Sequence, residues 1–409
     1  MRTPKQILET RTAPNGLRIV ALHRPGAAIG IAGIDVHAGS RDETPDTYGL
    51  AHFVEHTIFK GTRRRSSWHI INRMEAVGGE LNAYTTKEET VVYAVFPGAS
   101  PARGAELIAD LAADSQFPAA QLDREREVVA DEIDSYLDTP ADAVFDDFED
   151  SLYAGSPLGH NILGTRATLA TFDSATCRGY LSRWYVSSNM VAFYAGPMRP
   201  ARALDILERA FAAMPAAGAP RTMQKVPDVV PFDIVRHIDS HQSHTVLGAR
   251  VPGLRDPQRF ATGLLTNILG GPGMNSLLNV ELRERRGLVY TVEASTGLFT
   301  DTGALAIYYG CDPEDDARCR ALVTDTVTRV ADGYITPRRL EMAKKQYIGQ
   351  MAVGSESMES RITGIARQWL LTGVISEPQQ TIDAIHALTC EDIRAAAASL
   401  LPLNRLTLQ

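Results

Sequence analysis

The sequence lacks any hydrophobic run that could cross a membrane, because no apolar stretch approaches the roughly 18 consecutive residues of a helical span. Its N-terminus also has no apolar stretch of signal-peptide length. That segment predicts a short polar lead and then two strands joined by a turn at Pro14-Asn15-Gly16. We therefore expect a cytoplasmic protein without a membrane partner.

The sequence also has few cysteines and no excess of positive charge. The four cysteines are scattered and form no C-x-x-C pair, so they predict neither a zinc knuckle nor a disulfide framework. The formal net charge of −8 leaves no basic excess for binding nucleic acid. The one basic cluster, KGTRRRSS at residues 60–67, is expected to be a solvated turn.

A chain of 409 residues is too long for a single compact core. A stretch rich in proline, alanine and glycine covers residues 212–233, and its four prolines interrupt any regular element. The sequence therefore predicts an N-terminal domain at residues 1–213, a linker at 214–231 and a C-terminal domain at 232–409.

The two predicted domains repeat the same order of elements. Each has a β-rich segment ending at a glycine turn, then a helical pattern, a glycine-led pair of strands and a long later helix. The paired ranges are 28–40 and 243–253, 47–62 and 259–273, 78–96 and 286–310, and 120–137 and 337–351. This order predicts an α+β fold of two homologous domains, each a mostly antiparallel sheet with helices on one face.

The segment GLAHFVEHTIFKGT, residues 49–62, places His52, Glu55 and His56 within five positions. On a helix the two histidines share a face, so both imidazoles can reach one ion, with Glu55 beside them. The pattern H-x-x-E-H is that of an inverted zincin, although it also arises by chance on ordinary helices. The corresponding segment of the second half has no such cluster, because an offset of 209 residues brings Ala261, Leu264 and Leu265 to these positions.

A catalytic zinc needs a third protein ligand. The predicted helix at residues 122–136 carries Glu125 and Glu132 two turns apart, so they share one face. From their spacing alone, two such acids would more often form a solvated stripe on the helix surface.

The combined pattern resembles the pitrilysin (M16) family of zinc peptidases, in its small two-domain form that is similar to bacterial processing-peptidase-like proteins. The resemblance spans both halves of the chain. It rests on HFVEH, on a glutamate 76 positions after His56, and on the segments GGELNAYTTKEET, REREVVADEI, PLGHNILGT and GGPGMNSLLNVELRERRGLVY. It implies that the two domains form half of a clamshell around a peptide.

The resemblance also implies roles for individual residues. His52, His56 and Glu132 would bind one Zn²⁺ per chain, and Glu55 would be the general base for the attacking water. Glu125 would orient a ligand, with a purely structural role as the alternative. His160, His241 and His244 are expected to be loop, surface or strand-entry residues rather than further ligands.

Four residues outside the metal cluster are expected to bind substrate. Asn82 and Ala83 lie in LNAYT, which resembles the edge strand that holds the substrate backbone in this family. Arg283 and Tyr290 match the family's arginine and tyrosine, which would grip a substrate carbonyl and its oxyanion. Without the resemblance, Asn82 would be an ordinary hairpin residue and Arg283 a surface charge.

The resemblance implies a zinc metalloendopeptidase that cuts peptides or unfolded segments, held as an added strand inside a closed chamber. Long members of the family have four such units, whereas this chain has two. We therefore expect a homodimer in which Arg283 and Tyr290 of one chain complete the zinc site of the other. The alternatives are a non-catalytic structural subunit of the same fold and one chain of a heteromeric processing peptidase.

Overall fold

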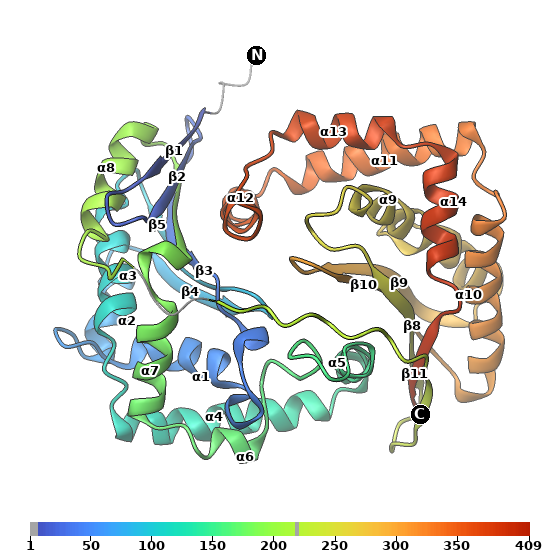
Figure 1. Ribbon diagram of the computed structural model, residues 1–409, viewed down its shortest axis with the longest axis horizontal. Coiled ribbons are helices and arrows are strands. Elements are labelled where there is room, and N and C mark those ends of the chain that lie inside the picture. The colour runs from blue at the N-terminus through green and yellow to red at the C-terminus, as the bar shows by residue number, and fades with distance from the viewer. Residues whose placement is uncertain (1–6, 217–220) are drawn as a thin grey trace. The chain divides into compact units, whose positions relative to one another are not determined.

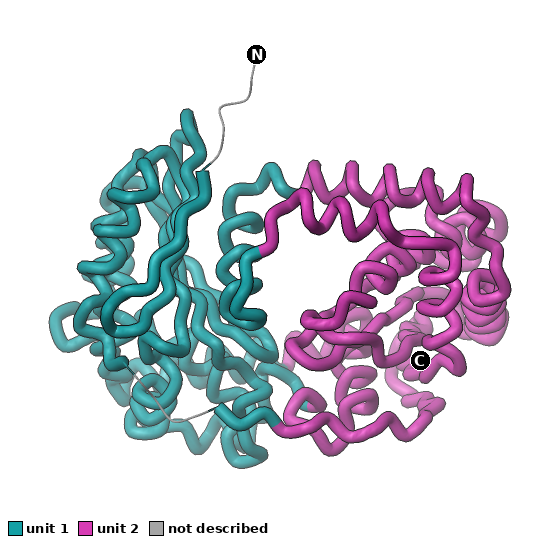
Figure 2. The backbone as a smooth tube through the Cα atoms, turned by 45° about the horizontal axis from the view of Figure 1, so that its top comes forward, with its two compact units in different colours: residues 1–133, 160–223, 355–375 teal, residues 134–159, 224–354, 376–409 magenta. Residues whose placement is uncertain are grey.

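The computed structural model describes residues 7–216 and 221–409 in two compact units (Figure 2). Unit 1 comprises residues 1–133, 160–223 and 355–375, and unit 2 comprises residues 134–159, 224–354 and 376–409. Residues 217–220 of the predicted linker and residues 1–6 of the predicted N-terminal lead lie outside the described residues. The units are therefore discontinuous in sequence, unlike the contiguous domains at 1–213 and 232–409.

Unit 1 is built on a six-stranded sheet in the order β1-β2-β6-β3-β5-β4. All of its neighbouring strands are antiparallel except β2 and β6. The strands are β1 (Ile7–Thr12), β2 (Arg18–His23), β3 (Ile29–Val36), β4 (Glu80–Thr85), β5 (Thr90–Pro97) and β6 (Met190–Gly196). The central strand β3 is buried from Gly30 onward, which explains its nearly continuous apolar sequence IGIAGIDV. β4 lies at the sheet's edge.

Helices cover both faces of this sheet. The larger set packs on the face that carries Ala32, Ile34 and Val92. This set and the shorter connecting helices are α1 (Leu50–Thr57), α2 (Ser67–Glu75), α3 (Ala102–Asp114), α4 (Ala119–Leu137), α6 (Arg166–Leu169), α7 (Ser174–Trp184) and α8 (Pro200–Ala210). The C-terminal end of α4, from Asp134, belongs to unit 2.

Unit 2 has a five-stranded sheet in the order β7-β11-β8-β10-β9, again with one parallel pair, β7 and β11. Figure 1 labels the strands β8 to β11 of this sheet. Its strands are β7 (Asp233–Arg236), β8 (Ser243–Val251), β9 (Val289–Leu298), β10 (Gly303–Cys311) and β11 (Asn404–Leu408). Its helices on the main face are α9 (Arg259–Gly270), α10 (Asp316–Ala331), α11 (Pro337–Gly354), α13 (Pro378–Ala387) and α14 (Cys390–Ser399). The strand order matches that of β2 to β6 in unit 1, so the predicted α+β fold of two similar domains is confirmed.

The prediction of helices on one face was incomplete, because each unit has a further helix on the opposite face. In unit 1 this helix is α12 (Met358–Thr372), from the C-terminal half of the chain, where Glu359 accepts a hydrogen bond from Tyr93 on β5 (2.6 Å). In unit 2 it is α5 (Pro140–Leu152), from the N-terminal half, whose Phe148 packs with Val246 of β8. Both helices bury an i, i+4, i+8 apolar stripe, which needs a partner surface.

The remaining helical segments are short. A π-helix, η5 (Asn279–Glu284), precedes β9. In the described residues, 3-10 helices lie at η1 (Ser40–Asp42), η2 (Pro45–Thr47), η3 (Ile58–Lys60), η4 (Ser187–Asn189) and η6 (Pro313–Asp315). Among the described residues, no helix combines the length and the hydropathy that a membrane crossing demands.

Candidate metal centre

Helix α1 carries two histidines on one side and a hydrophobic core contact on the other. It begins after Gly49, whose φ of 94° is a left-handed conformation that favours glycine. Phe53 and Val54 are fully buried in the core of unit 1. Because a helix turns once every 3.6 residues, His52 and His56 lie one above the other.

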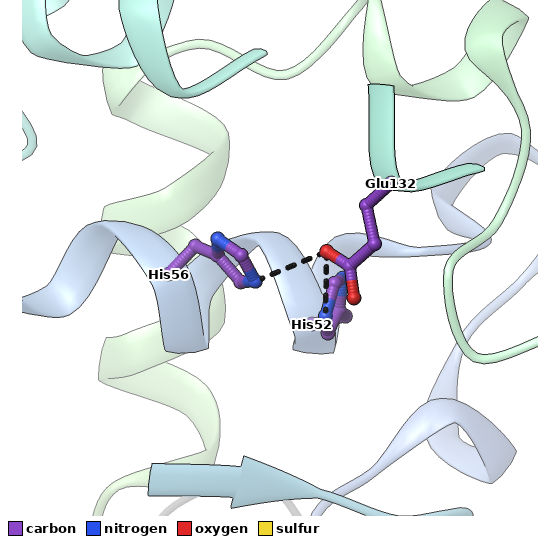
Figure 3. A group of neighbouring side chains, drawn as sticks. All are labelled: His52, His56 and Glu132. Carbon is purple, nitrogen blue, oxygen red and sulfur yellow. Dashed lines mark ion pairs between the residues drawn. The ribbon is translucent and has the colours of Figure 1, made fainter. Parts of the chain in front are cut away.

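Helix α4 brings a carboxylate to both histidines (Figure 3). One oxygen of Glu132, Oε2, lies 3.4 Å from Nε2 of His56 and 3.7 Å from Nε2 of His52. One donor atom from each residue lies within 4.8 Å of the other two. The structure therefore brings together the three residues that were predicted to be metal ligands. Elsewhere in the described ranges, no other group of three histidine, cysteine or acidic residues is this close.

Glu125, the other acid on this face of α4, holds the ring of His56 in place. Oε1 of Glu125 accepts a hydrogen bond from Nδ1 of His56 (3.2 Å), which leaves Nε2 of that ring with its lone pair toward Glu132. The other oxygen of Glu125 lies 2.6 Å from Nζ of Lys60. Of the two roles expected for Glu125, its hydrogen bond with His56 fits the orientation of a ligand. The H-x-x-E-H pattern did not indicate Lys60, which lies beyond the end of α1 in the 3-10 turn Ile58–Lys60.

The electrostatics of His52 suit a metal ligand. Burial lowers the pKa of His52 to about 3, and the neighbouring His56 acts in the same direction. The ring is therefore neutral at physiological pH, and a metal requires a neutral imidazole. Two imidazole nitrogens and one carboxylate form a donor set that zinc accepts in catalytic sites, so these residues fit the metal.

Glu55 lies on the same helix but is not one of the three clustered donors. Its pKa is raised, chiefly because the side chain is largely buried, while Thr85 and His56 act to lower it. A carboxylate whose pKa is raised by burial is a stronger base than an exposed one, as a general base requires. Thr85 is the last residue of the edge strand β4.

The strand that carries Asn82 and Ala83 is an edge strand, as expected. β4 pairs with β5 through Asn82–Tyr93 and Ala83–Val92, and no described strand pairs with its other side. Ala83 packs against the core of unit 1, so Asn82, its neighbour in the strand, points to the opposite face. The two residues therefore cannot present their side chains to the same surface.

Arg283 and Tyr290 belong to unit 2, whereas the histidines belong to unit 1. Arg285 and Arg286 both pair with Glu281, at 2.8 and 2.7 Å, but within the described part of the chain Arg283 has no carboxylate partner. Arg283 lines a cavity of about 310 Å³ between the glycine-rich loop 270–274 and β9. Tyr290, near the start of the edge strand β9, is 77% exposed.

His160, His241 and His244 lie outside the group of clustered metal donors. Nε2 of His160 donates to Glu43 (2.9 Å), and Nδ1 of His244 lies 2.9 Å from the hydroxyl of Tyr308. His241 is exposed. In the basic cluster, Arg64 and Arg65 form ion pairs with acids of α3.

Known proteins resemble the chain over nearly its whole length. The family model described as "Insulinase (Peptidase family M16)" matches residues 18–166, and the one described as "Peptidase M16 inactive domain" matches residues 172–347. An uncharacterized zinc protease of Mycobacterium tuberculosis is 34% identical, over 95% of this chain and 90% of that protein. A probable mitochondrial-processing peptidase subunit beta of Schizosaccharomyces pombe is 30% identical, over 96% and 88%.

Solved structures share the fold. A crystal structure of a peptidase M16 inactive domain from Pseudomonas fluorescens has a TM-score of 0.90 at 20% identity, and covers 98% of this chain and 97% of its own. A protease from Helicobacter pylori has a TM-score of 0.88 at 19% identity, with 98% and 99% covered.

Proposed function

The chain belongs to peptidase family M16, and from this premise we propose that it is a zinc metalloendopeptidase that hydrolyses peptides or unfolded segments. The observation that carries the proposal is the convergence of His52, His56 and Glu132 from two helices, with Glu55 on the first of them. The relatives that are named zinc proteases support the choice of metal.

Each side chain has a defined part in this chemistry. Zinc, when bound by His52, His56 and Glu132, supplies a Lewis acid that polarises the peptide carbonyl and makes a water nucleophilic. Glu55 removes a proton from the attacking water and returns it to the nitrogen of the leaving amine. Glu125 keeps the proton of His56 on Nδ1, so that Nε2 stays available as a ligand.

The free side of β4 supports a mode of substrate binding. An extended peptide can add to this edge through main-chain hydrogen bonds, which depend little on its sequence. Peptides and unfolded segments supply an extended strand most readily, which supports the proposed class of substrate. Asn82 and Ala83 would contact this strand from opposite faces of the sheet.

We propose that the enzyme is a homodimer with shared sites inside a closed chamber. Arg283 and Tyr290 of one chain would bind the substrate carbonyl at the zinc site of the other. Arg283 has no carboxylate partner among the described residues, whereas its neighbours Arg285 and Arg286 both pair with Glu281, and this difference supports the role.

Mixing two inactive variants tests the sharing. In a dimer of Glu55→Gln and Arg283→Ala chains, one of the two composite sites has both wild-type residues. Random exchange of subunits should therefore restore about a quarter of the wild-type activity. No recovery, with exchange verified by a tag on one variant, would show that each site is completed within its own chain.

The name of the S. pombe relative, a peptidase subunit, favours one alternative, in which the chain needs a different partner chain. Cleavage of peptides by the purified chain alone, inhibited by a zinc chelator, would exclude both that alternative and a purely structural role. The four cysteines are free, which suits a reducing compartment, and we propose that the enzyme works in the cytoplasm.

A further inference from the structure

A buried carboxylate–imidazole pair lies at the N-terminal end of α1, outside the metal centre. Glu43 is 5% exposed and His160 is 8% exposed. Oε1 of Glu43 accepts a hydrogen bond from the backbone N–H of Ala51 (2.7 Å). Oε2 accepts from the N–H of Gly49 (2.9 Å) and from Nε2 of His160 (2.9 Å). The carboxylate therefore joins the start of the helix to a distant loop.

These contacts fix the helix one residue before its first metal ligand. α1 has only eight residues, and Ala51 directly precedes His52. The first N–H groups of a helix have no partner within it, and Glu43 binds two of the groups at this end. The loop that follows His160 also packs closely here, because a Cβ on Gly49 would lie 2.5 Å from the carbonyl oxygen of Leu163.

His160 is itself held from two sides. Its ring stacks on Tyr48 with centroids 3.6 Å apart and an interplanar angle of 10°. Its carbonyl oxygen accepts a hydrogen bond from Nζ of Lys87. Lys87 lies in the turn between β4 and β5, two residues after the edge strand ends.

The segment that carries Glu43 binds the same turn. The backbone N–H of Arg41 donates to the carbonyl oxygen of Lys87 (2.7 Å), and the guanidinium of Arg41 pairs with Glu88 at 2.6 Å in the interior. One continuous set of buried contacts therefore runs from the edge strand's turn, through Glu43 and His160, to the start of α1.

We propose that Glu43 and His160 form a brace that sets the zinc-binding helix α1 against the edge strand β4, and that both act as positioning residues for peptide hydrolysis. The inference rests on the proposed function. A peptide added to β4 presents one bond to the metal, so a small shift of α1 along the strand would misplace that bond. Displacements of about 1 Å can cost two orders of magnitude in rate.

Two variants and their conservative counterparts test the brace. Glu43→Ala and His160→Ala should weaken zinc binding and lower kcat, each by about 10-fold or more, while KM changes little. Glu43→Gln should recover part of both losses, because its amide oxygen still accepts from the N–H of Ala51. His160→Gln keeps an N–H donor and should recover more than His160→Ala. Cobalt-substituted protein gives a second readout, because the visible absorption bands report the ligand geometry.

A matched control separates positioning from general stability. Asp316 is a buried carboxylate in unit 2 that accepts hydrogen bonds from Thr245 (2.8 Å) and Tyr309 (2.9 Å). Asp316→Ala should lower Tm, and its zinc Kd and cobalt spectrum should stay those of the wild type.

The possible outcomes are distinct. Wild-type zinc Kd, cobalt spectrum and kcat in folded Glu43→Ala and His160→Ala would overturn the brace. If the alanine variants do not fold, unchanged values in both Glu43→Gln and His160→Gln would overturn it, and graded losses would support it. If the wild type binds zinc but cleaves no peptide, the proposed function fails, and the zinc Kd and cobalt spectra still decide whether the brace positions α1.

Discussion

Helices α1 and α9 occupy the same place in the two units, ahead of the hairpins β4–β5 and β9–β10. The residues at their equivalent positions differ in chemistry. α1 carries His52, Glu55 and His56, and α9 carries Ala261, Leu264 and Leu265, all three of which are buried. The contacts with the following long helix differ as well. α1 meets α4 through histidine–glutamate contacts, whereas α9 meets α11 through a neutral amide hydrogen bond between Asn267 and Gln350 (2.6 Å).

The comparison shows that this fold does not need the polar cluster. Unit 2 fills the corresponding place with leucine, which contributes hydrophobic burial without a desolvation penalty. In unit 1 the same place holds a neutral buried histidine and a largely buried carboxylate, which stabilise a fold poorly unless they have partners. The polar cluster of α1 is therefore best explained by chemistry, and the leucines of α9 by stability.

The largest expected effect comes from removing a ligand. His52→Ala should abolish both zinc binding and peptide cleavage, because two remaining donors do not make a catalytic zinc site. Elemental mass spectrometry would measure the loss of zinc, and cleavage of a quenched fluorescent peptide would measure the loss of activity. A variant that keeps full zinc content would place the metal elsewhere.

A substitution at the equivalent helix of unit 2 tests the structural role of α9. Leu265→Ala should reduce the free energy of unfolding by about 2–5 kcal/mol, because it leaves a cavity in the core of unit 2. Its zinc Kd should not change. Denaturant unfolding and a chelator competition assay would measure the two quantities, and a weakened zinc site would show that α9 shares in the metal chemistry.

A smaller effect is expected where α4 orients His56. Glu125→Gln should weaken zinc binding by about 10–100-fold, because the amide is a poorer acceptor for the N–H of His56. Glu127→Gln is the matched control, since Glu127 is an exposed acid of the same helix. Equal zinc Kd values for the two variants would remove Glu125 from the metal centre.

The smallest effect is expected at the corresponding contact of unit 2. Asn267→Ala removes one hydrogen bond to Gln350 and should cost about 1 kcal/mol of stability, with no change in zinc Kd. Thermal unfolding would measure it. A loss as large as that from Leu265→Ala would mean that the amide contact, and not the apolar face, holds α9 in place.

Local patterns in the sequence predicted much of the fold. The helix expected at 337–351 is α11 (Pro337–Gly354), the one at 120–137 is α4 (Ala119–Leu137), and the glycine-led strand pairs are the two hairpins. A long segment with a regular spacing of hydrophobic residues predicts its own helix or strand, because the same face is buried along its length.

Long-range features were not predictable in the same way. The apolar stripes of α5 and α12 indicate helices, but they do not say that each would pack in the unit formed mainly by the other half of the chain. His160 looked like a loop residue, and nothing near it in sequence pointed to Glu43, which lies 117 positions away. Similarly, only the family resemblance linked Glu132 to the histidines of α1, because spacing alone favoured a solvated stripe.

Glu55→Gln gives the most direct test of the central claim that α1 and α4 form one zinc site with Glu55 as its base. Zinc content and peptide cleavage would be measured on the same preparation. We predict one zinc per chain, as in the wild type, with cleavage reduced by roughly 10²–10⁴-fold. Cleavage at the wild-type rate, or a wild-type protein that binds no zinc, would contradict it.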